Sequence, residues 1–355
     1  MLKIFTQSKQ NSSPSNTLNG NCHYFLFKKN TFTEIYFMSV NWNGVFPALT
    51  TKFTKDDQLD LPMFKKNLDV QLQAGVHGII LGGTLGEASV LTTEEKSQMV
   101  QFAVENVESK IPVILNIAEG ATRDALKQAE LAEKWGCQGL MLLPPMRYKS
   151  DHRETVAYFK TIAKSTGLPI MIYNNPVDYK IEVTLDMFGE LADCKNIQAV
   201  KESTRDVTNV TRMLTRFGGR YKILCGVDTL AMEEMLMGAH GWVAGLVCAF
   251  PAETMAVYNL VKAGRIKEAT YIYRWFMPLL ELDIHAKLVQ YIKLAETLEG
   301  IGTERVREPR LTLAGEERER ILKVINDGIA SRPNLKSYSQ HEKILSSTSA
   351  KSMSL

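Results

Sequence analysis

A repeating order of short apolar runs and helical segments constrains the fold of this chain more than any other feature of its sequence. Between Trp42 and Lys262 this order occurs eight times. The apolar runs lack polar alternation, which is typical of parallel strands covered by helices. In the second helical segment, Thr92 or Thr93 precedes two acidic residues, as expected of a helix N-cap. The predicted strands are residues 44–49, 78–81, 112–117, 139–143, 168–173, 197–201, 221–225 and 242–246.

The eight units predict a TIM (β/α)8 barrel. Eight βα units within roughly 220 residues match the size of that fold, in which helices surround a closed parallel sheet. A doubly wound open sheet is the alternative, but it needs a switch point and usually a glycine fingerprint on its first turn, and neither is visible. The predicted helices are 61–74, a segment starting at 94, 123–135, 153–165, 185–192, 207–217, 229–237 and 251–262.

The segments on either side of the barrel differ from it in composition. Residues 1–37 are rich in Asn, Ser, Lys, Phe and Tyr, so we expect a disordered extension or a mis-assigned start with Met38 as the initiator. Their scarcity of acids would suit a transit peptide, but the absence of Arg counts against one. Helical spacing also covers 266–297 and 316–329. The predicted regions are the barrel (38–265), a C-terminal helical appendage (266–331) and a disordered Ser- and Lys-rich tail (332–355).

Composition and charge argue against several function classes. Apolar residues make up 45% of the chain, and the formal net charge of +3 is spread along it, so we expect no nucleic-acid partner. The longest apolar runs are too short to span a bilayer, so we expect no membrane segment. Five widely spaced cysteines indicate buried thiols in a reducing compartment and predict a cytoplasmic location. The six histidines form no HExxH motif and no Cys/His cluster, so we predict no metal and no other cofactor.

Lys201 ends the sixth predicted strand, residues 197–201. At the C-terminal rim of a barrel, where the active sites of this fold lie, a lysine can be partly desolvated. Its pKa then falls, and the neutral amine can attack a carbonyl carbon to form a Schiff base. A solvated lysine that closes a strand is the structural alternative, because a perturbed charge alone does not identify a catalytic group.

Other predicted strands end in small or polar residues at the same rim. After the second strand, Gly83 and Thr84 bring backbone N–H groups and a hydroxyl to a place where a carboxylate can bind, although a tight β-to-α turn is the alternative. Glu87 either orients this loop or caps the next helix. Tyr173 ends the fifth strand, where a tyrosine can relay a proton, and Gly226 follows the seventh. The loops after strands seven and eight lack a Gly-rich phosphate cradle, which disfavours a phosphorylated substrate.

Three motifs on these strands together resemble the N-acetylneuraminate lyase/dihydrodipicolinate synthase superfamily. They are Gly-Thr-x-Gly-Glu, Tyr-Asn-x-Pro and Lys-Glu-Ser, with the lysine 28 residues beyond the tyrosine, and the resemblance covers about 43–330. It implies a barrel with a C-terminal helical domain and usually a homotetramer. The family's lysine, which forms a Schiff base with a 2-oxo acid, corresponds to Lys201. Its proton-shuttling tyrosine corresponds to Tyr173. Its catalytic and carboxylate-binding turn corresponds to Gly83, Thr84 and Leu85.

The sequence departs from the synthase pattern at three positions. Leu85 stands where the synthase and many lyases carry a second hydroxyl residue. Asp178 stands where the synthase binds its second substrate's carboxylate with an arginine, and the reversed charge would repel that group. In the strand-four loop, Arg147 stands where the synthase has a tyrosine that reaches a neighbouring subunit's site. We therefore expect Arg147 or Tyr148 to serve a different substrate.

The pattern most resembles the branch that deaminates 1-pyrroline-4-hydroxy-2-carboxylate to 2-oxoglutarate semialdehyde. In that reaction Lys201 would attack C2 of the cyclic imine, and the iminium would acidify C3. The 4-hydroxyl would leave as water, and hydrolysis would release ammonia. Asp178 or Asn175 would meet the hydroxyl or the ring nitrogen, and Gly226 would line the substrate site.

Other functions remain open at this point. One is an aldolase that cleaves 4-hydroxy-2-oxoglutarate, a sialic acid or a sugar-derived 2-oxo acid to pyruvate. Synthase activity is disfavoured by Asp178. A different class is a non-catalytic 2-oxo acid binding protein, which the pair of Lys201 and Tyr173 disfavours because it has little structural reason to lie at a rim. In every case the expected ligand is a small-molecule carboxylate.

Overall fold

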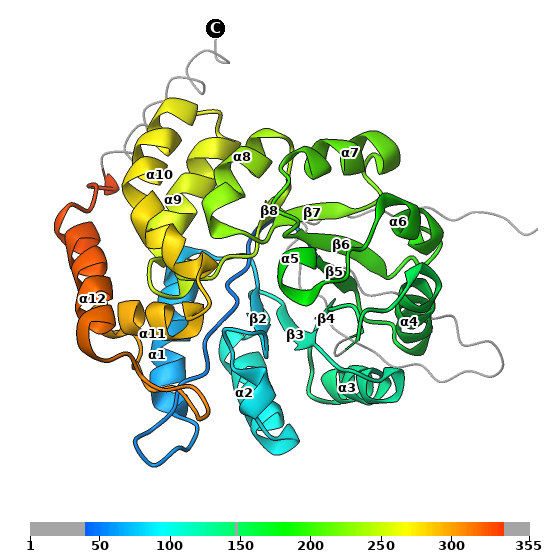
Figure 1. Ribbon diagram of the computed structural model, residues 1–355, viewed down its shortest axis with the longest axis horizontal. Helices are drawn as coiled ribbons and strands as arrows, with labels where there is room; N and C mark the ends of the chain where they lie inside the picture. Colours follow the sequence, from blue (N-terminus) through cyan, green and yellow to red (C-terminus); the bar gives the residue numbers. More distant parts are fainter. Residues whose placement is uncertain (1–39, 146–147, 337–355) are drawn as a thin grey trace, which may run out of the picture. The chain divides into compact units, whose positions relative to one another are not determined.

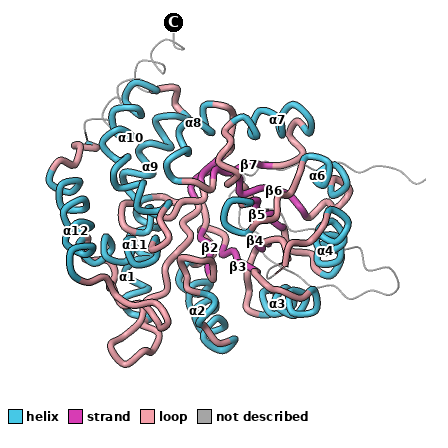
Figure 2. Tube along the Cα trace, viewed as in Figure 1, coloured by secondary structure: helices cyan, strands magenta, loops and turns pink. Residues whose placement is uncertain are grey.

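Eight parallel strands form the centre of the computed structural model, which describes residues 40–145 and 148–336. The strands pair in the order β1-β8-β7-β6-β5-β4-β3-β2, and helices lie around them (Figure 1, Figure 2). Nearly all strand residues are buried, because helices cover the outer side of the sheet. The strands are β1 (Gly44–Val45), β2 (Ile79–Leu81), β3 (Val113–Ile117), β4 (Gly139–Leu142), β5 (Ile170–Asn174), β6 (Ile197–Glu202), β7 (Lys222–Cys225) and β8 (Gly241–Trp242).

A short parallel bridge closes the sheet between its first two strands. Ala48, just beyond β1, pairs with Ile80 of β2. The amide of Leu49 donates to the carbonyl of Ile80 at 3.0 Å, and the amide of Ile80 donates to the carbonyl of Pro47 at 2.8 Å. The sheet therefore closes on itself, and the predicted TIM (β/α)8 barrel is confirmed.

The helices of the barrel begin and end close to their predicted positions. The bounds of α1 coincide with the prediction, and Thr92 caps α2 in a capping box with Glu95. Within the described ranges, no helix combines the length and the apolar character needed to cross a membrane. The barrel helices are α1 (Leu61–Ala74), α2 (Thr93–Val107), α3 (Thr122–Lys134), α4 (His152–Ser165), α6 (Leu185–Leu191), α7 (Thr208–Phe217), α8 (Ala231–Leu236) and α9 (Pro251–Lys262).

The last strand of the barrel is shorter than the sequence predicts. A strand is expected over 242–246, whereas β8 ends at Trp242 and a 3-10 turn covers Leu246–Cys248. The amides of Gly245 and Leu246 donate to the buried carboxylate of Asp228, at 3.1 and 2.7 Å. Because a side chain takes these donors, the apolar run leaves the ladder early.

A register shift between β5 and β6 sets the level of Lys201. Ile170 pairs with Ile197, but the next residue, Met171, pairs with Ala199, so the register shifts by one residue at Gln198. The side chain of Gln198 accepts a hydrogen bond from Trp42 Nε1 at 3.0 Å. A bulge of this kind re-aims the residues that follow it. Here it places Lys201 directly opposite Tyr173.

The C-terminal helices pack beside the end of the barrel, and α10 contacts both α9 and α12 (Figure 1). The helical pattern over 266–297 is interrupted between Leu280 and Leu288, where η4 forms a short 3-10 turn. The predicted domain boundaries stay predictions, and residues 1–39 and 337–355 lie outside the described residues. The C-terminal elements are α10 (Ile266–Leu280), η4 (Glu281–Ile284), α11 (Leu288–Leu298) and α12 (Gly315–Ala330).

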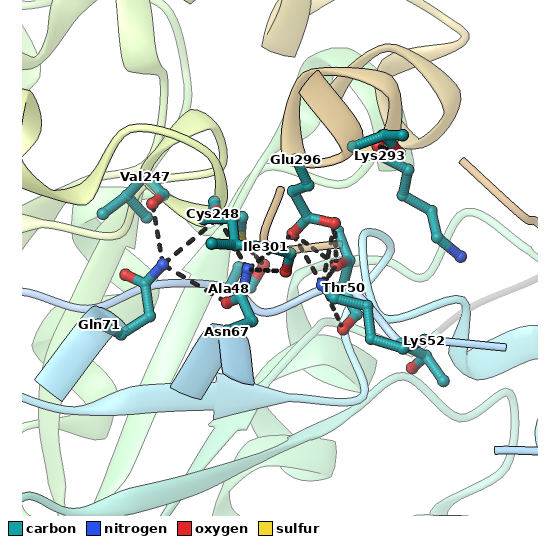
Figure 3. Close-up of polar contacts among 12 residues, drawn as sticks. Ala48, Thr50, Lys52, Asn67, Gln71, Val247, Cys248, Lys293, Glu296 and Ile301 are labelled. Atoms are coloured by element: carbon teal, nitrogen blue, oxygen red, sulfur yellow. Dashed lines mark hydrogen bonds and ion pairs between the residues drawn. The ribbon is translucent and has the colours of Figure 1, made fainter. Parts of the chain in front are cut away.

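Buried charges attach α11 to the barrel (Figure 3). Glu296 of α11 accepts hydrogen bonds from Lys52 Nζ at 2.8 Å and from Thr50 Oγ1 at 2.8 Å. The side chains of Lys52 and Glu296 are 1% and 0% exposed. A second buried pair joins Lys293 of α11 to Glu87, at 2.6 Å. The side chain of Glu87 makes no helix-capping hydrogen bond, so of the two predicted roles, orienting the loop and capping the next helix, the structure favours the first.

Candidate active site

Lys201 lies at the end of β6 and faces a cavity of about 770 Å³ at the C-terminal ends of the strands. The residue is 8% exposed, and among the described residues its Nζ has no hydrogen-bond or ion-pair partner. Burial lowers the pKa of Lys201, opposed by the nearby acidic groups Tyr179, Asp283 and Asp228. A buried amine with a lowered pKa and no hydrogen-bond partner has the properties of a nucleophile.

Tyr173 lies beside Lys201 and presents its ring to the amine. The Lys201 Nζ is 4.0 Å from the centroid of the Tyr173 ring. The Tyr173 hydroxyl accepts a hydrogen bond from Asn175 Nδ2 at 3.1 Å. Burial raises the pKa of Tyr173 to about 12. Tyr173 therefore contacts the amine through its aromatic face, and Asn175 holds its hydroxyl.

A four-residue helix, α5 (Pro176–Tyr179), follows β5 and was not predicted from the sequence. Asn175 caps it by accepting a hydrogen bond from the amide of Asp178 at 3.1 Å, and Pro176 occupies its first turn. Such a short helix has too few residues to show a periodic pattern. It carries Tyr179 into the cavity, where the Tyr179 hydroxyl lies 2.9 Å from Thr84 Oγ1.

The turn after β2 offers backbone donors to the same cavity. Gly83, Thr84 and Leu85 line it. Within the described part of the chain, the amides of these three residues donate to no other group. Several unpaired N–H groups on successive residues of a turn form a concavity that binds anions. The turn can therefore hold a carboxylate without a second hydroxyl, although Leu85 itself adds only apolar contact.

Gly226 borders Lys201 so closely that a side chain would displace the amine. A Cβ at this position would lie 2.6 Å from Lys201 Cε and 2.2 Å from Ser203 Oγ. Gly226 also lines the cavity, and its lack of a side chain leaves room for the lysine stem.

We expect Gly226→Ala to lower kcat/KM by about 100-fold, because a displacement of roughly 1 Å at the reacting group has an effect of that size. Steady-state kinetics and the rate of Schiff-base trapping measure the change. Gly219→Ala is the matched control, since no atom lies within 4 Å of a Cβ there. Equal activities of the two variants would contradict this account of Gly226.

Acidic side chains also line the cavity. Asp178 is exposed, lines the cavity and lies 3.9 Å from Arg205. Asp283 comes from η4 in the C-terminal helical region and also lines the cavity. Burial raises the pKa of Asp283 well above its usual range, and the neighbouring Asp228 raises it further. A Cβ on Gly245 would lie 2.0 Å from Asp283 Oδ1, so Asp283 packs directly on the barrel rim.

The structure brings together most of the residues that the sequence singled out. Seven of them line one cavity with Lys201, namely Tyr173, Thr84, Gly83, Leu85, Asn175, Asp178 and Gly226. Arg147 lies outside the described residues, and Tyr148 is exposed and does not line the cavity. Sequence reasoning missed Tyr179 and Asp283. Tyr179 lies only six residues after Tyr173, which was a usable signal, whereas the position of Asp283 in a helical appendage gave none.

The described residues contain no group of three or more His, Cys, Asp or Glu side chains arranged to hold a metal ion. The cysteines in the described ranges are free thiols, and three of the four are buried. The chemical groups that line the cavity include amines, guanidinium groups, an imidazole, hydroxyls, carboxyls and backbone donors. These groups suit covalent and acid–base chemistry on a small carboxylic acid.

These features define a closed (β/α)8 barrel protein with a C-terminal helical region and a polar cavity at the barrel rim. Residues 41–327 match the Dihydrodipicolinate synthetase family, and the chain belongs to that family.

Similar proteins support this assignment over most of the chain. The 4-hydroxy-tetrahydrodipicolinate synthase of Exiguobacterium sibiricum is 31% identical over 272 residues, which are 77% of this chain and 92% of the relative. The corresponding enzyme of Staphylococcus carnosus is 30% identical and covers 80% and 96%. The crystal structure of dihydrodipicolinate synthase from Bacillus anthracis has a TM-score of 0.79 at 26% identity, covering 83% of this chain and all of that one.

Proposed function

We propose that this enzyme forms a Schiff base between Lys201 and a small 2-oxo acid or cyclic imino acid, and that its reaction is the dehydrating deamination of 1-pyrroline-4-hydroxy-2-carboxylate. One observation carries the proposal. The buried Lys201 amine has no hydrogen-bond or ion-pair partner among the described residues, and it shares a cavity with a carboxylate-binding turn and with acidic side chains.

The reaction begins with the substrate carboxylate on the amides of Gly83, Thr84 and Leu85. This position directs C2 of the substrate toward Lys201. Attack of the amine on C2 opens the ring imine and leaves an iminium that acidifies C3. Loss of the C3 proton and of the 4-hydroxyl as water, followed by hydrolysis, gives 2-oxoglutarate semialdehyde and ammonia. The net reaction consumes one water, so no oxidant or reductant is needed.

The acidic side chains in the cavity favour a substrate with a single carboxylate. Asp178 and Asp283 line the same cavity as the glycine turn. A second carboxylate near Asp178 would meet like charge, whereas a hydroxyl or a protonated ring nitrogen would meet hydrogen-bond partners. The raised pKa of Asp283 favours the protonated carboxyl, which can donate its proton to a leaving hydroxyl.

The names of the relatives favour a second candidate, 4-hydroxy-tetrahydrodipicolinate synthase activity. Asp178 argues against it, because the position that would need a positive charge for a second carboxylate carries a negative one. Arg205 lies near Asp178, but its nearest contact there is the aspartate itself at 3.9 Å. The product of the reaction separates this candidate from the deaminase and from a pyruvate-releasing aldolase.

Borohydride trapping tests the proposal. The protein is incubated with pyruvate or with 1-pyrroline-4-hydroxy-2-carboxylate, reduced, and digested for peptide mass spectrometry. We expect an adduct on Lys201 with both ligands, and release of ammonia and 2-oxoglutarate semialdehyde from the second. Release of pyruvate from a hydroxylated 2-oxo acid would instead favour the aldolase. Consumption of pyruvate in the presence of a carboxylate-bearing aldehyde as second substrate would favour the synthase. A folded protein that gave no adduct with either ligand would contradict Schiff-base chemistry and favour a binding protein.

A further inference from the structure

We propose that Tyr179 is a catalytic residue whose hydroxyl, hydrogen-bonded to Thr84, carries the protons of the Schiff-base reaction. The family resemblance assigns this task to Tyr173, and nothing in the sequence singled out Tyr179. The inference rests on the proposed Schiff-base chemistry of Lys201, and it names the group that supplies and removes protons at the reacting carbon atoms.

The first support is the position of the Tyr179 hydroxyl. It lies 2.9 Å from Thr84 Oγ1, although the two residues are 95 positions apart in the chain. Thr84 belongs to the carboxylate-binding turn after β2, and Tyr179 ends the short helix after β5. Both side chains line the cavity together with Lys201. The hydroxyl pair therefore shares one cavity with the turn that would hold the substrate and with the amine that would attack it.

The second support is that Tyr173 uses its hydroxyl elsewhere. Its ring face covers Lys201 Nζ, and its hydroxyl is hydrogen-bonded to Asn175. The rings of Tyr173 and Tyr179 are nearly perpendicular, at 78°, with centroids 5.5 Å apart. Tyr173 therefore packs on the lysine through its ring, and Tyr179 is the tyrosine whose hydroxyl lies within hydrogen-bond distance of Thr84 in the carboxylate-binding turn.

The third support is the electrostatic coupling of Tyr179 and Lys201. After burial, Tyr179 is the strongest influence on the pKa of Lys201, and it raises that pKa. Burial raises the pKa of Tyr179 to about 12, while the hydrogen bond with Thr84 and the charge of Lys201 lower it. A phenolate at Tyr179 would therefore be stabilised once a positive iminium forms on Lys201, which is when a proton acceptor is needed.

The proton transfers balance within this pair. With a 2-oxo acid, Tyr179 gives its proton to the hydroxyl of the carbinolamine, the C2–O bond breaks and water leaves as the C=N bond forms. The resulting phenolate then removes a proton from C3, and the electrons of that C–H bond form the enamine. This step restores the phenol. With a cyclic imine the first proton goes to the ring nitrogen instead, and the second transfer is unchanged.

The location of α5 explains why Tyr179 can do this. The cap from Asn175 and the following Pro176 fix the start of the helix, and its single turn points Tyr179 back over the barrel mouth. Asn175 also donates hydrogen bonds to the hydroxyl of Tyr173 at 3.1 Å and to the carboxylate of Asp178 at 2.7 Å. It is therefore a positioning residue for both tyrosines. Thr84 and Tyr179 belong to one chain, so their contact needs no second subunit.

The test compares Tyr179→Phe with Tyr173→Phe in two assays that use pyruvate alone. Proton NMR in D2O follows exchange of the pyruvate methyl protons, which requires removal of the C3 proton. Borohydride trapping with mass spectrometry follows formation of the adduct on Lys201. We expect Tyr179→Phe to slow methyl exchange by about 10²- to 10⁴-fold, the range typical of a lost acid–base group. The adduct on Lys201 should still form in Tyr179→Phe, at a reduced rate.

Two further measurements separate a proton carrier from a structural role. Thr84→Ser should keep most of the exchange rate because it retains a hydroxyl, whereas Thr84→Val should lose it. In Tyr179→Phe, the rate of methyl exchange should no longer change with pH in the range where Tyr179 titrates. The melting temperature of this variant should equal that of the wild-type protein. A Tyr179→Phe rate within threefold of wild type would overturn the inference, and so would a loss confined to Tyr173→Phe. If the wild-type protein neither exchanged the methyl protons of pyruvate nor formed an adduct with it, both the proposed function and this inference would be contradicted. That outcome is distinguishable from the two variant outcomes, in which the wild-type protein is active.

Discussion

Replacing Lys201 with methionine is expected to abolish turnover. The variant should lose activity by about 10⁴-fold or more, as seen when a covalent nucleophile is removed from an enzyme. No adduct should form with pyruvate or with the pyrroline substrate, because Lys201 is the amine that faces the cavity opposite Tyr173. Borohydride trapping and steady-state kinetics measure both effects. Activity retained by Lys201→Met would contradict the assignment of this residue.

The same substitution should stabilise the folded protein in a pH-dependent way. Burial lowers the pKa of Lys201, so the folded state binds its proton more weakly than the unfolded state does. Burying the charged Lys201 lowers the free energy of unfolding by its full amount below the pKa that the lysine has in the folded protein. The effect disappears above the pKa of about 10.4 that it has in the unfolded chain. Lys201→Met should therefore raise the melting temperature most at neutral and acid pH, and hardly at all near pH 10.5. Lys195→Met, at an exposed lysine before β6, is the control and should show no such pH dependence.

The second large effect is expected at the buried pair of Lys52 and Glu296. Glu296→Gln removes one charge and leaves Lys52 buried without its partner (Figure 3). Breaking a buried ion pair on one side typically costs about 3–5 kcal/mol, because the remaining charge is uncompensated. For a domain of this size that loss lowers the melting temperature by about 10 °C. Calorimetry and chemical unfolding measure the loss, and Lys52→Met should behave similarly.

The double variant distinguishes a charge effect from a packing effect. Lys52→Met combined with Glu296→Gln removes both charges and should recover most of the stability lost in either single variant. The exposed pair of Lys65 and Asp69 is the control, since its removal should change stability by less than about 0.5 kcal/mol. If the losses of the two single variants simply added in the double variant, the two charges would not be coupled.

Prediction from the sequence succeeded where the signal is local. The eight units of strand and helix, the bounds of α1 and the cap of α2 follow from residues within a few positions of one another. The strand that carries Lys201 was predicted as 197–201, and β6 covers Ile197–Glu202. Because the strands of a closed parallel barrel all end at one rim, the order of the strands alone predicted that Thr84, Tyr173 and Lys201 would meet. Their roles in the reaction stay predictions.

Prediction failed where distant groups compete for the backbone. The strand expected over 242–246 ends at Trp242, because the carboxylate of Asp228 takes the amides of Gly245 and Leu246. The pattern over 266–297 breaks at η4, which brings Asp283 to the barrel rim. Neither effect leaves a trace in the hydrophobic periodicity of the segment that it changes, since the partner lies elsewhere in the chain.

The sequence by itself determined the barrel, the lysine at the end of its sixth strand and the family to which the chain belongs. Only the tertiary structure decided how the groups at the rim face one another. A bulge at Gln198 sets Lys201 level with Tyr173, and a helix of one turn brings Tyr179 to Thr84. The physical reason is that periodicity records which face of an element is buried. Register and side-chain contacts instead depend on long-range hydrogen bonds and packing between elements.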